Sequence, residues 1–435
     1  MKSASKRNSV LQAILYSAAI ATTTALSLLA PTLSKPAGAS LEDSPKAVLD
    51  EAWQIVNREY VDGSFNQTDW QETRRTLLEK NYTSREQAYE ALRQALDELN
   101  DPYTRFLDPE QFKTLTNQTS GEMSGVGMQL KEDELTKVIT VVDVVENSPA
   151  MKAGLLPGDQ ILEIDGKPTA SLNVSAAAKL IRGDVGTDVV LQVMRSGEAE
   201  FDVTLTRARI ELQAVRYELK REGNERIGYI HLQEFSAHAG EQMQKAIENL
   251  DNQNADGYVL DLRGNPGGLL RISIDIARML MDKGAIVSTV DRNGDKQELR
   301  ANRSALTDKP IVVLVDGDSA SASEILAGAL KDNGRAVIMG DQTFGKALVQ
   351  SVHSLSDGSG LAVTIAHYYT PKGTDISKKG VTPDVSINLT DSQKRRLYRQ
   401  PGAIATISDP YYSRAVNLLK NKILLRPLVL RNQQN

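Results

Sequence analysis

Three serines two residues apart, Ser319, Ser321 and Ser323, stand in the stretch DSASASEIL, between an apolar run and a helical pattern. A serine can act as a nucleophile only when a neighbouring group takes up its proton. Histidine usually has that role, but the chain has only 4 histidines, and the stretches around them favour structural roles. A catalytic serine in this stretch would therefore need a proton acceptor of another type.

The same stretch predicts where a helix begins. The run PIVVLVDGDSASASEILAGAL has the pattern of a buried strand, a tight turn and a helix. The first N–H groups of a helix have no partner within it, and the helix dipole favours negative charge there, which suits the oxyanion of acyl transfer. Ser321 and Glu324 also fit a capping box, so the stretch taken alone is compatible with a purely structural role.

Lys346 is the candidate proton acceptor. It is the only charged residue between Gln342 and Val352, in the stretch QTFGKALVQSV just past a predicted strand. A lysine can accept a proton only when it is neutral, and burial among apolar groups disfavours its charged form. A pair formed by Ser321 and Lys346 would need no histidine.

Alternating strands and helices predict the domain that would position this pair. From Arg226 onward, strand-like apolar runs alternate with helical ones, which is typical of a layered α/β domain with a largely parallel sheet. We therefore expect an α+β or α/β multidomain chain. Its expected parts are a signal sequence, a helical segment, a small β module, the α/β core and a basic helical tail, at residues 1–39, 40–116, 117–209, 210–390 and 391–435 respectively.

The β module at residues 117–209 contains a candidate binding loop. The glycines of SGVGMQL lack the preceding strand, the following helix and the further glycine that a nucleotide site needs. The later stretch AGLLPGDQILEIDG resembles PDZ domains. That resemblance implies a groove for the C-terminal end of a peptide, with Gly125, Val126, Gly127 and Met128 as the loop that faces the terminal carboxylate. A module that only packs on the α/β core is the alternative.

The motifs taken together resemble one family, the carboxyl-terminal processing peptidases. The matching pieces are NDPYTRFLDPEQF, the PDZ-like module, VLDLRGNPGGLL, SASASEILAGALKDN and TFGKALVQ, and they extend over nearly the whole mature chain. In that family the nucleophile is the middle serine and the base is a lysine 25 residues later, and Ser321 and Lys346 have this spacing. The resemblance implies that Ser321 is the nucleophile and Lys346 the base.

The resemblance also implies roles for surrounding residues. Gln350 matches the glutamine that orients the lysine. The backbone N–H groups of Ala322 and Gly267 match the oxyanion donors, and Asp332 matches an acidic position for which we expect a structural role behind the site. The family usually has glycine after the lysine, where this chain has Ala347; if that position required a positive φ, alanine would cost on the order of 1 kcal/mol or more.

As a whole the resemblance implies a crotonase/Clp-like α/β peptidase core and an exported serine endopeptidase that cuts near the C-terminal ends of protein substrates. The stretch EAWQIVNREYVDGSFNQTDW is most similar to cyanobacterial and chloroplast members. This similarity implies the thylakoid lumen or the periplasm, and a photosystem II reaction-centre precursor as a substrate. Two alternatives are a scaffold that captures C-termini without cleaving them, which Ala347 would favour, and a crotonase-like acyl-transfer enzyme, which the peptide-binding module disfavours.

The N-terminus predicts export. Basic residues precede an uncharged run from Val10 to Ala30, and the small residues Ala37, Gly38 and Ala39 fit cleavage after Ala39. The alternative is that this run stays on the chain as an anchor, since it is about long enough to span a bilayer. The mature protein would then be held at a membrane surface.

Composition excludes several classes of function. The formal net charge of −5, without a long basic run, argues against a nucleic-acid partner. The absence of cysteine excludes a disulfide framework and a thiol nucleophile. No group of residues has the spacing of metal ligands, so we expect neither a metal nor another cofactor.

Overall fold

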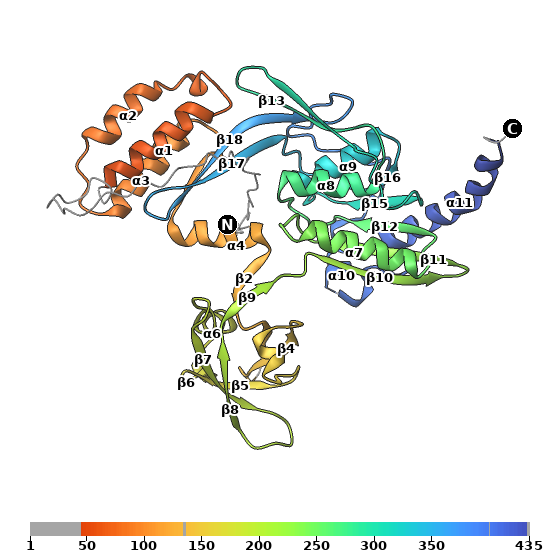
Figure 1. Ribbon diagram of the computed structural model, residues 1–435, viewed down its shortest axis with the longest axis horizontal. Coiled ribbons are helices and arrows are strands. Elements are labelled where there is room, and N and C mark those ends of the chain that lie inside the picture. The colour runs from red at the N-terminus through yellow and green to blue at the C-terminus, as the bar shows by residue number, and fades with distance from the viewer. Residues whose placement is uncertain (1–44, 134–135, 400, 433–435) are drawn as a thin grey trace, which may run out of the picture. The chain divides into compact units, whose positions relative to one another are not determined.

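The computed structural model describes residues 45–133, 136–399 and 401–432 (Figure 1). The predicted signal sequence, residues 1–39, lies outside the described residues. The described residues form two compact units: one runs from Ser120 to Leu212, and the other combines the described residues up to Thr119 with those from Gln213 onward. Each unit has a buried apolar cluster of its own.

A six-stranded sheet forms the centre of the larger unit (Figure 1). Neighbouring strands pair in parallel, except for an antiparallel strand at one edge. Central parallel strands are buried on both faces and therefore read as continuous apolar runs, as IVVLV does. In spatial order the strands are β10 (Val215–Glu222), β11 (Glu225–Leu232), β12 (Gly257–Asp261), β15 (Ile311–Val315), β16 (Ala336–Gly340) and β19 (Val385–Ser386).

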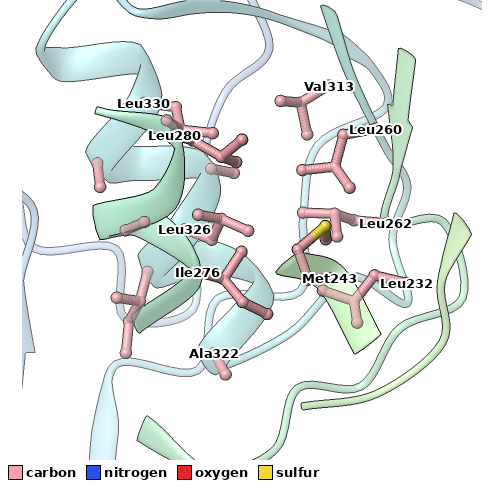
Figure 2. Packing of buried hydrophobic residues seen from close by; sticks show 14 of the residues in the cluster. Leu232, Met243, Leu260, Leu262, Ile276, Leu280, Val313, Ala322, Leu326 and Leu330 are labelled. Carbon is pink, nitrogen blue, oxygen red and sulfur yellow. The ribbon is translucent and has the colours of Figure 1, made fainter. Parts of the chain in front are cut away.

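Alternate residues of these strands face two helical layers. Leu260 and Val313 pack on one side, where Figure 2 shows them opposite Leu326, and Val259 and Leu314 pack on the other side. Because both faces are covered, the loops at the strand ends are held in fixed positions. The first layer contains α7 (Ala239–Asn252), α8 (Leu270–Leu280) and α9 (Ala322–Asp332), and the second contains α11 (Pro410–Asn432).

A second, antiparallel sheet lies in the larger unit, and the N-terminal helices pack on its strand β18. Its strand β18 (Gly360–Tyr369) pairs with β17 (Leu348–Ser354), β13 (Ala285–Asp291) and β1 (Arg105–Leu107), and β13 also pairs with β14 (Lys296–Arg300). The sequence pattern placed β1 in a helical segment, since a strand of 3 residues is too short to show a period of two. The N-terminal helices are α1 (Pro45–Glu59), α2 (Trp70–Glu79), α3 (Arg85–Asp97) and α4 (Pro109–Ser120).

The smaller unit is β-rich, as expected for a PDZ domain. Its main sheet has β3 at one edge and is packed against one longer helix, α6. A separate pair of strands, β2 and β9, lies where the chain enters and leaves the unit. The elements are β2 (Glu122–Gly125), β3 (Met128–Glu132), β4 (Ile139–Val144), α5 (Pro149–Lys152), β5 (Gln160–Ile164), β6 (Lys167–Pro168), α6 (Val174–Ile181), β7 (Asp188–Met194), β8 (Phe201–Thr206) and β9 (Ala208–Glu211).

The C-terminal segment packs on the core sheet. After a short helix, α10 (Asp391–Tyr398), the start of α11 buries Tyr411, Tyr412 and Val416 against the second face of the sheet. The helical pattern predicted for this segment is therefore confirmed, and its apolar side covers the core. Within the described ranges, we find no helix with the length and apolar character needed to cross a membrane.

Candidate active site

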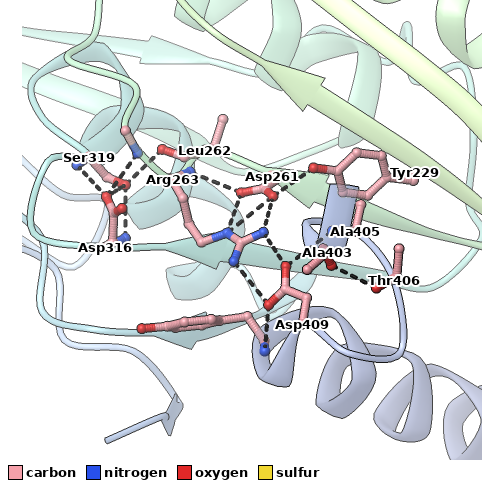
Figure 3. Close-up of polar contacts among 12 residues, drawn as sticks. Tyr229, Asp261, Leu262, Arg263, Asp316, Ser319, Ala403, Ala405, Thr406 and Asp409 are labelled. Carbon is pink, nitrogen blue, oxygen red and sulfur yellow. Dashed lines mark hydrogen bonds and ion pairs between the residues drawn. The ribbon is translucent and has the colours of Figure 1, made fainter. Parts of the chain in front are cut away.

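The serine stretch forms the expected strand, turn and helix. Ser319 Oγ donates to the Leu262 carbonyl oxygen at 2.8 Å (Figure 3), and Ser323 Oγ donates to the Asn265 carbonyl oxygen at 2.9 Å. These two hydroxyls therefore join the turn to the loop after β12. Ser321 and Glu324 form the capping box that the sequence predicted at the start of α9, in which Glu324 Oε2 accepts the Ser321 N–H at 2.9 Å.

Ser321 has an unusual backbone conformation. Its φ is 53° and its ψ is −111°, and its side chain is largely buried. Positive φ is costly for a residue with a Cβ and is found where the surrounding structure enforces it, often at functional sites. A sharp strand-to-helix turn of this kind presents a nucleophile at the helix N-terminus. No pattern in the sequence predicted this strain.

Gly267 lies against the nucleophile turn. Its φ is 108°, and a Cβ at this position would lie 2.7 Å from the Ala320 carbonyl oxygen and 3.0 Å from both the Ala322 nitrogen and the Ser321 Cβ. Only glycine can therefore approach the nucleophile so closely. The Gly267 N–H donates to Asn265 Oδ1 at 2.9 Å, so in this conformation the predicted oxyanion donor already has an acceptor.

Lys346 is buried and has a specific partner. Its Nζ donates to Gln350 Oε1 at 2.7 Å and lies 4.6 Å from the centre of the Tyr103 ring. The Gln350 amide in turn donates to the Tyr103 carbonyl oxygen at 2.6 Å. Within the described residues, the structure shows no hydrogen bond between Lys346 Nζ and Ser321 Oγ. Sequence reasoning missed Tyr103, although it lies in the family-like stretch NDPYTRF.

The environment of Lys346 favours its neutral form. Burial is the largest cause that lowers the Lys346 pKa, and the positive charge of Arg105 lowers it further. The carboxylates of Asp101 and Glu324 offset part of this effect, which leaves the pKa at about 8. A lysine with this pKa is partly neutral near neutral pH and can accept a proton.

Glu324 connects the two halves of the site. Its Oε2 accepts the N–H groups of Ser321 and Lys346, each at 2.9 Å, and its Oε1 accepts the Gly345 N–H at 2.7 Å and the Thr343 hydroxyl. Burial raises the pKa of this carboxyl, and the four donors act in the opposite direction. The sequence indicated Glu324 only as part of a capping box. The fold makes it a bridge between two distant turns.

Two further positions from the sequence analysis have clear surroundings. Asp332 ends α9, roughly 16 to 17 Å along the helix from Ser321, and accepts the Lys372 N–H at 3.0 Å. Ala347 is buried and is not among the residues with positive φ. The condition under which alanine would strain this position therefore does not hold, and the reason to favour a scaffold without catalysis disappears.

In the smaller unit, the predicted carboxylate loop is tightly folded. Gly127 has φ 81°, and a Cβ there would lie 2.2 Å from the Ser148 Cβ. The carbonyl oxygens of Val126 and Gly127 accept backbone N–H groups at 2.8 and 2.9 Å. Met128 then begins β3, which lies at the edge of its sheet, next to α6. An edge strand beside a helix is the arrangement that accepts a peptide as an added strand.

The histidines and acids form no metal site in the ranges that the structure describes. His353 Nε2 lies 2.7 Å from Glu59 Oε2 and 2.8 Å from Ser351 Oγ. Both partners contact the same ring nitrogen, so this cluster lacks the geometry of a serine–histidine–acid triad, in which each ring nitrogen has its own partner.

These features together define a class. A PDZ-type unit accompanies an α/β core in which a strained serine at a helix N-terminus lies beside a glycine-rich loop and a buried lysine. The chain is a serine-type peptidase with a PDZ domain. Comparison of sequences supports both parts: the profile of Peptidase family S41 matches residues 226–387, and that of the PDZ domain matches residues 140–195.

Named relatives identify the family. The chain is 42% identical over 397 residues to the carboxyl-terminal-processing protease of Synechocystis sp., covering 90% of each chain. It is 42% identical over 346 residues to the chloroplastic carboxyl-terminal-processing peptidase 2 of Arabidopsis thaliana, covering 77% of this chain and 67% of the relative. A solved structure of a photosystem II D1 C-terminal processing protease is 38% identical with a TM-score of 0.52, covering 79% and 93% of the two chains. This chain belongs to the carboxyl-terminal-processing protease family.

Proposed function

We propose that Ser321 and Lys346 form the catalytic dyad of this peptidase. Ser321 Oγ attacks the scissile carbonyl carbon, and neutral Lys346 Nζ takes the hydroxyl proton and then gives it to the leaving amine. Water, deprotonated by the same lysine, then releases the acyl group from Ser321. The observation that carries this proposal is the burial of Lys346 and the 2.7 Å hydrogen bond that holds its Nζ against Gln350 Oε1.

Gln350 has a positioning role in this proposal. Its Oε1 holds Lys346 Nζ, while its own amide is held by the Tyr103 carbonyl oxygen. The orientation of the glutamine is thus determined by a residue 247 positions earlier in the chain. A base held in one orientation loses less conformational freedom when it takes up the serine proton.

The oxyanion would be bound by the N–H groups of Ala322 and Gly267. The Ala322 N–H is the first of a helix and has no intrahelical acceptor. The Gly267 N–H would exchange Asn265 Oδ1 for the oxyanion, which carries more negative charge than an amide oxygen. That exchange would make the second donor available only when the tetrahedral intermediate forms.

The PDZ unit would bind the C-terminal end of the substrate. We assign the loop of Gly125, Val126, Gly127 and Met128 to the terminal carboxylate, with β3 accepting the peptide as an added strand. The tight folding of Gly127 against Ser148 and the free edge of β3 support this assignment. The peptidase would then select proteins by an accessible C-terminus.

For the physiological substrate, we propose the precursor of a photosystem II reaction-centre protein. Support comes from the solved relative that is named as a photosystem II D1 C-terminal processing protease and from chloroplastic and cyanobacterial relatives. The cyanobacterial and chloroplastic relatives also support export of this chain to the periplasm or the thylakoid lumen. The N-terminal 39 residues would direct that export.

Mass spectrometry of cleavage products tests the dyad directly. The full-length protein and its Ser321→Ala and Lys346→Ala variants are incubated with an unstructured protein that has an apolar C-terminus. We expect cleavage near that end by the unchanged protein, no cleavage by either variant, and retained binding of a C-terminal peptide by both. Cleavage at an unchanged rate by a folded Ser321→Ala or Lys346→Ala protein would disprove the assignment.

A further inference from the structure

The loop that carries Gly267 starts at a buried arginine. Arg263 follows Leu262, whose carbonyl oxygen accepts the Ser319 hydroxyl at 2.8 Å. Arg263 precedes Gly264, whose N–H donates to Asp316 Oδ1 at 3.0 Å. The residues on both sides of Arg263 are thus hydrogen-bonded to the turn that presents the nucleophile. Any shift of the main chain at Arg263 is transmitted to that turn and to the loop.

The Arg263 guanidinium pairs with two buried carboxylates (Figure 3). Its Nε donates to Asp261 Oδ1 at 2.9 Å, and its Nη2 donates to Asp409 Oδ2 at 2.8 Å. A further bond joins its Nη1 to Asp409 Oδ1 at 3.2 Å. The exposed fractions are 7% for Arg263, 1% for Asp261 and 0% for Asp409. Two carboxylates on two edges of a planar guanidinium fix its orientation.

The two carboxylates have different origins. Asp261 lies two residues before Arg263 at the end of β12, so it moves with the loop. Asp409 lies 146 residues after Arg263, directly before α11. It accepts the Tyr411 N–H at 3.0 Å and the Ala405 N–H at 3.2 Å. Asp409 is therefore anchored independently of the loop. It provides Arg263 with a fixed reference point on the C-terminal segment.

We propose that Asp409 is a positioning residue of the catalytic centre, which holds the loop from Gly264 to Gly268 against the nucleophile turn through its paired contacts with Arg263. The inference rests on the proposed oxyanion role of Gly267. It also gives Asp409, a residue of the C-terminal segment, a role in the reaction that it exerts through Arg263. Loss of the Asp409 charge leaves Arg263 buried with one carboxylate and frees its second edge to move.

The test is the Asp409→Asn variant of the full-length protein. Asparagine caps helices as well as aspartate does, so the start of α11 is retained while the charge is removed. We expect kcat on an unstructured, apolar-tailed protein to fall about 10- to 100-fold, because small displacements of catalytic donors have effects of this size. KM should change less than about threefold, since the peptide-binding loop of the PDZ unit is untouched.

Hydrogen exchange distinguishes positioning from a general loss of stability. Peptides that cover the loop from Gly264 to Gly268 should exchange faster in Asp409→Asn at a temperature where the protein remains folded. The matched control is Tyr412→Phe, which removes the 3.0 Å bond from the α11 residue Tyr412 to Glu222 and leaves Arg263 untouched. In this control, loop exchange and kcat should both stay as in the unchanged protein.

The outcomes separate this inference from the proposed function. Unchanged kcat together with unchanged loop exchange in Asp409→Asn would overturn the inference and leave the dyad assignment intact. Cleavage by Ser321→Ala would overturn the dyad and leave the loop-exchange result standing. If Asp409→Asn does not fold, Asp409→Glu provides the same comparison, because it keeps the charge but displaces it by one methylene. Normal kcat and normal loop exchange in Asp409→Glu would then count against the inference.

Discussion

The backbone N–H groups of Ser321 and Lys346 share one acceptor, Glu324 Oε2, at 2.9 Å each. On the other side, the Tyr368 hydroxyl lies 3.2 Å from the Ser321 carbonyl oxygen and also contacts the Lys346 carbonyl oxygen. Two turns that are separate in the sequence are thereby held together at the main chain. The turn of the proposed nucleophile and the turn of the proposed base are therefore fixed relative to each other.

Replacing Glu324 by glutamine should impair catalysis more than substrate binding. A glutamine has one acceptor oxygen, and its amide group would face N–H donors that it cannot satisfy. Hydrogen bonds to charged groups contribute roughly 1.5–3 kcal/mol, so we expect a loss of stability of that order and a large drop in kcat. Steady-state kinetics and thermal unfolding measure both. Wild-type kcat in Glu324→Gln would show that the bridge has no catalytic importance.

The pH dependence should report the lysine. Lys346 acts only when deprotonated, so kcat/KM on an unstructured substrate should rise with pH to a plateau, with a midpoint near the Lys346 pKa of about 8. Arg105 is one cause of the lowered pKa, so Arg105→Gln should move the midpoint to higher pH. A rise of kcat/KM centred near pH ~6.5 that disappears on replacement of His353 or His367 would identify a histidine as the base instead.

Lys346→Met should be inactive but more stable than the unchanged protein at neutral pH. A lysine whose pKa is lowered by folding binds its proton more weakly in the folded state. Burial of the charged lysine therefore lowers the free energy of unfolding by its full amount below a pH of about 8. This cost disappears above pH 10.5, the ordinary pKa of a lysine. Methionine removes this cost, so the free energy of unfolding at pH 7 should rise by about 1–3 kcal/mol after the lost Gln350 bond is included.

The decisive measurement for this variant is denaturant unfolding at several pH values. The gain in stability over the unchanged protein should shrink as the pH rises from 7 to 10, because the unchanged protein then loses its penalty. A gain that is independent of pH would mean that better packing, and not the charge of Lys346, explains it.

Gln350→Ala should reduce the plateau of the pH profile more than it changes KM. The lysine would lose the acceptor that orients its Nζ, and the cavity left by the side chain would admit water beside it. A measurement of kcat and KM across pH separates these effects. A change confined to KM would place Gln350 in substrate binding.

Gly127→Ala should weaken the binding of substrates that carry a free C-terminal carboxylate. The new Cβ would collide with Ser148, and the φ of 81° disfavours alanine, so the carboxylate loop must change shape. KM should rise for the free-acid substrate and little for the same substrate with an amidated end. Gly186→Ala is the matched control, since its φ is 86° and its Cβ would meet nothing within 4 Å.

Equal kinetics for free-acid and amidated substrates in the unchanged protein would contradict the role of this loop. In that case the PDZ unit would not detect the terminus, and the effect of Gly127→Ala would have to come from folding alone.

Much of this protein can be read from local patterns. The run from Pro310 through Leu330 shows a buried strand, a turn and a helix within some twenty residues, and the structure has these elements in that order. The PDZ-like stretch is one short motif, and Ser321 and Lys346 lie in two others that are 25 residues apart. Such features are visible because period, turn residues and motif spacing are properties of neighbouring residues.

The contacts that complete the site are not local. Tyr103 meets Gln350 across 247 residues, and Asp409 meets Arg263 across 146. Tyr103 lies in a turn before the three-residue strand β1, where no period can show. Asp409 stands in a segment that the sequence showed only as a polar, helical tail. Each becomes part of the site because the sheets bring distant segments together, and burial then makes one hydrogen bond or ion pair far stronger than it would be in water.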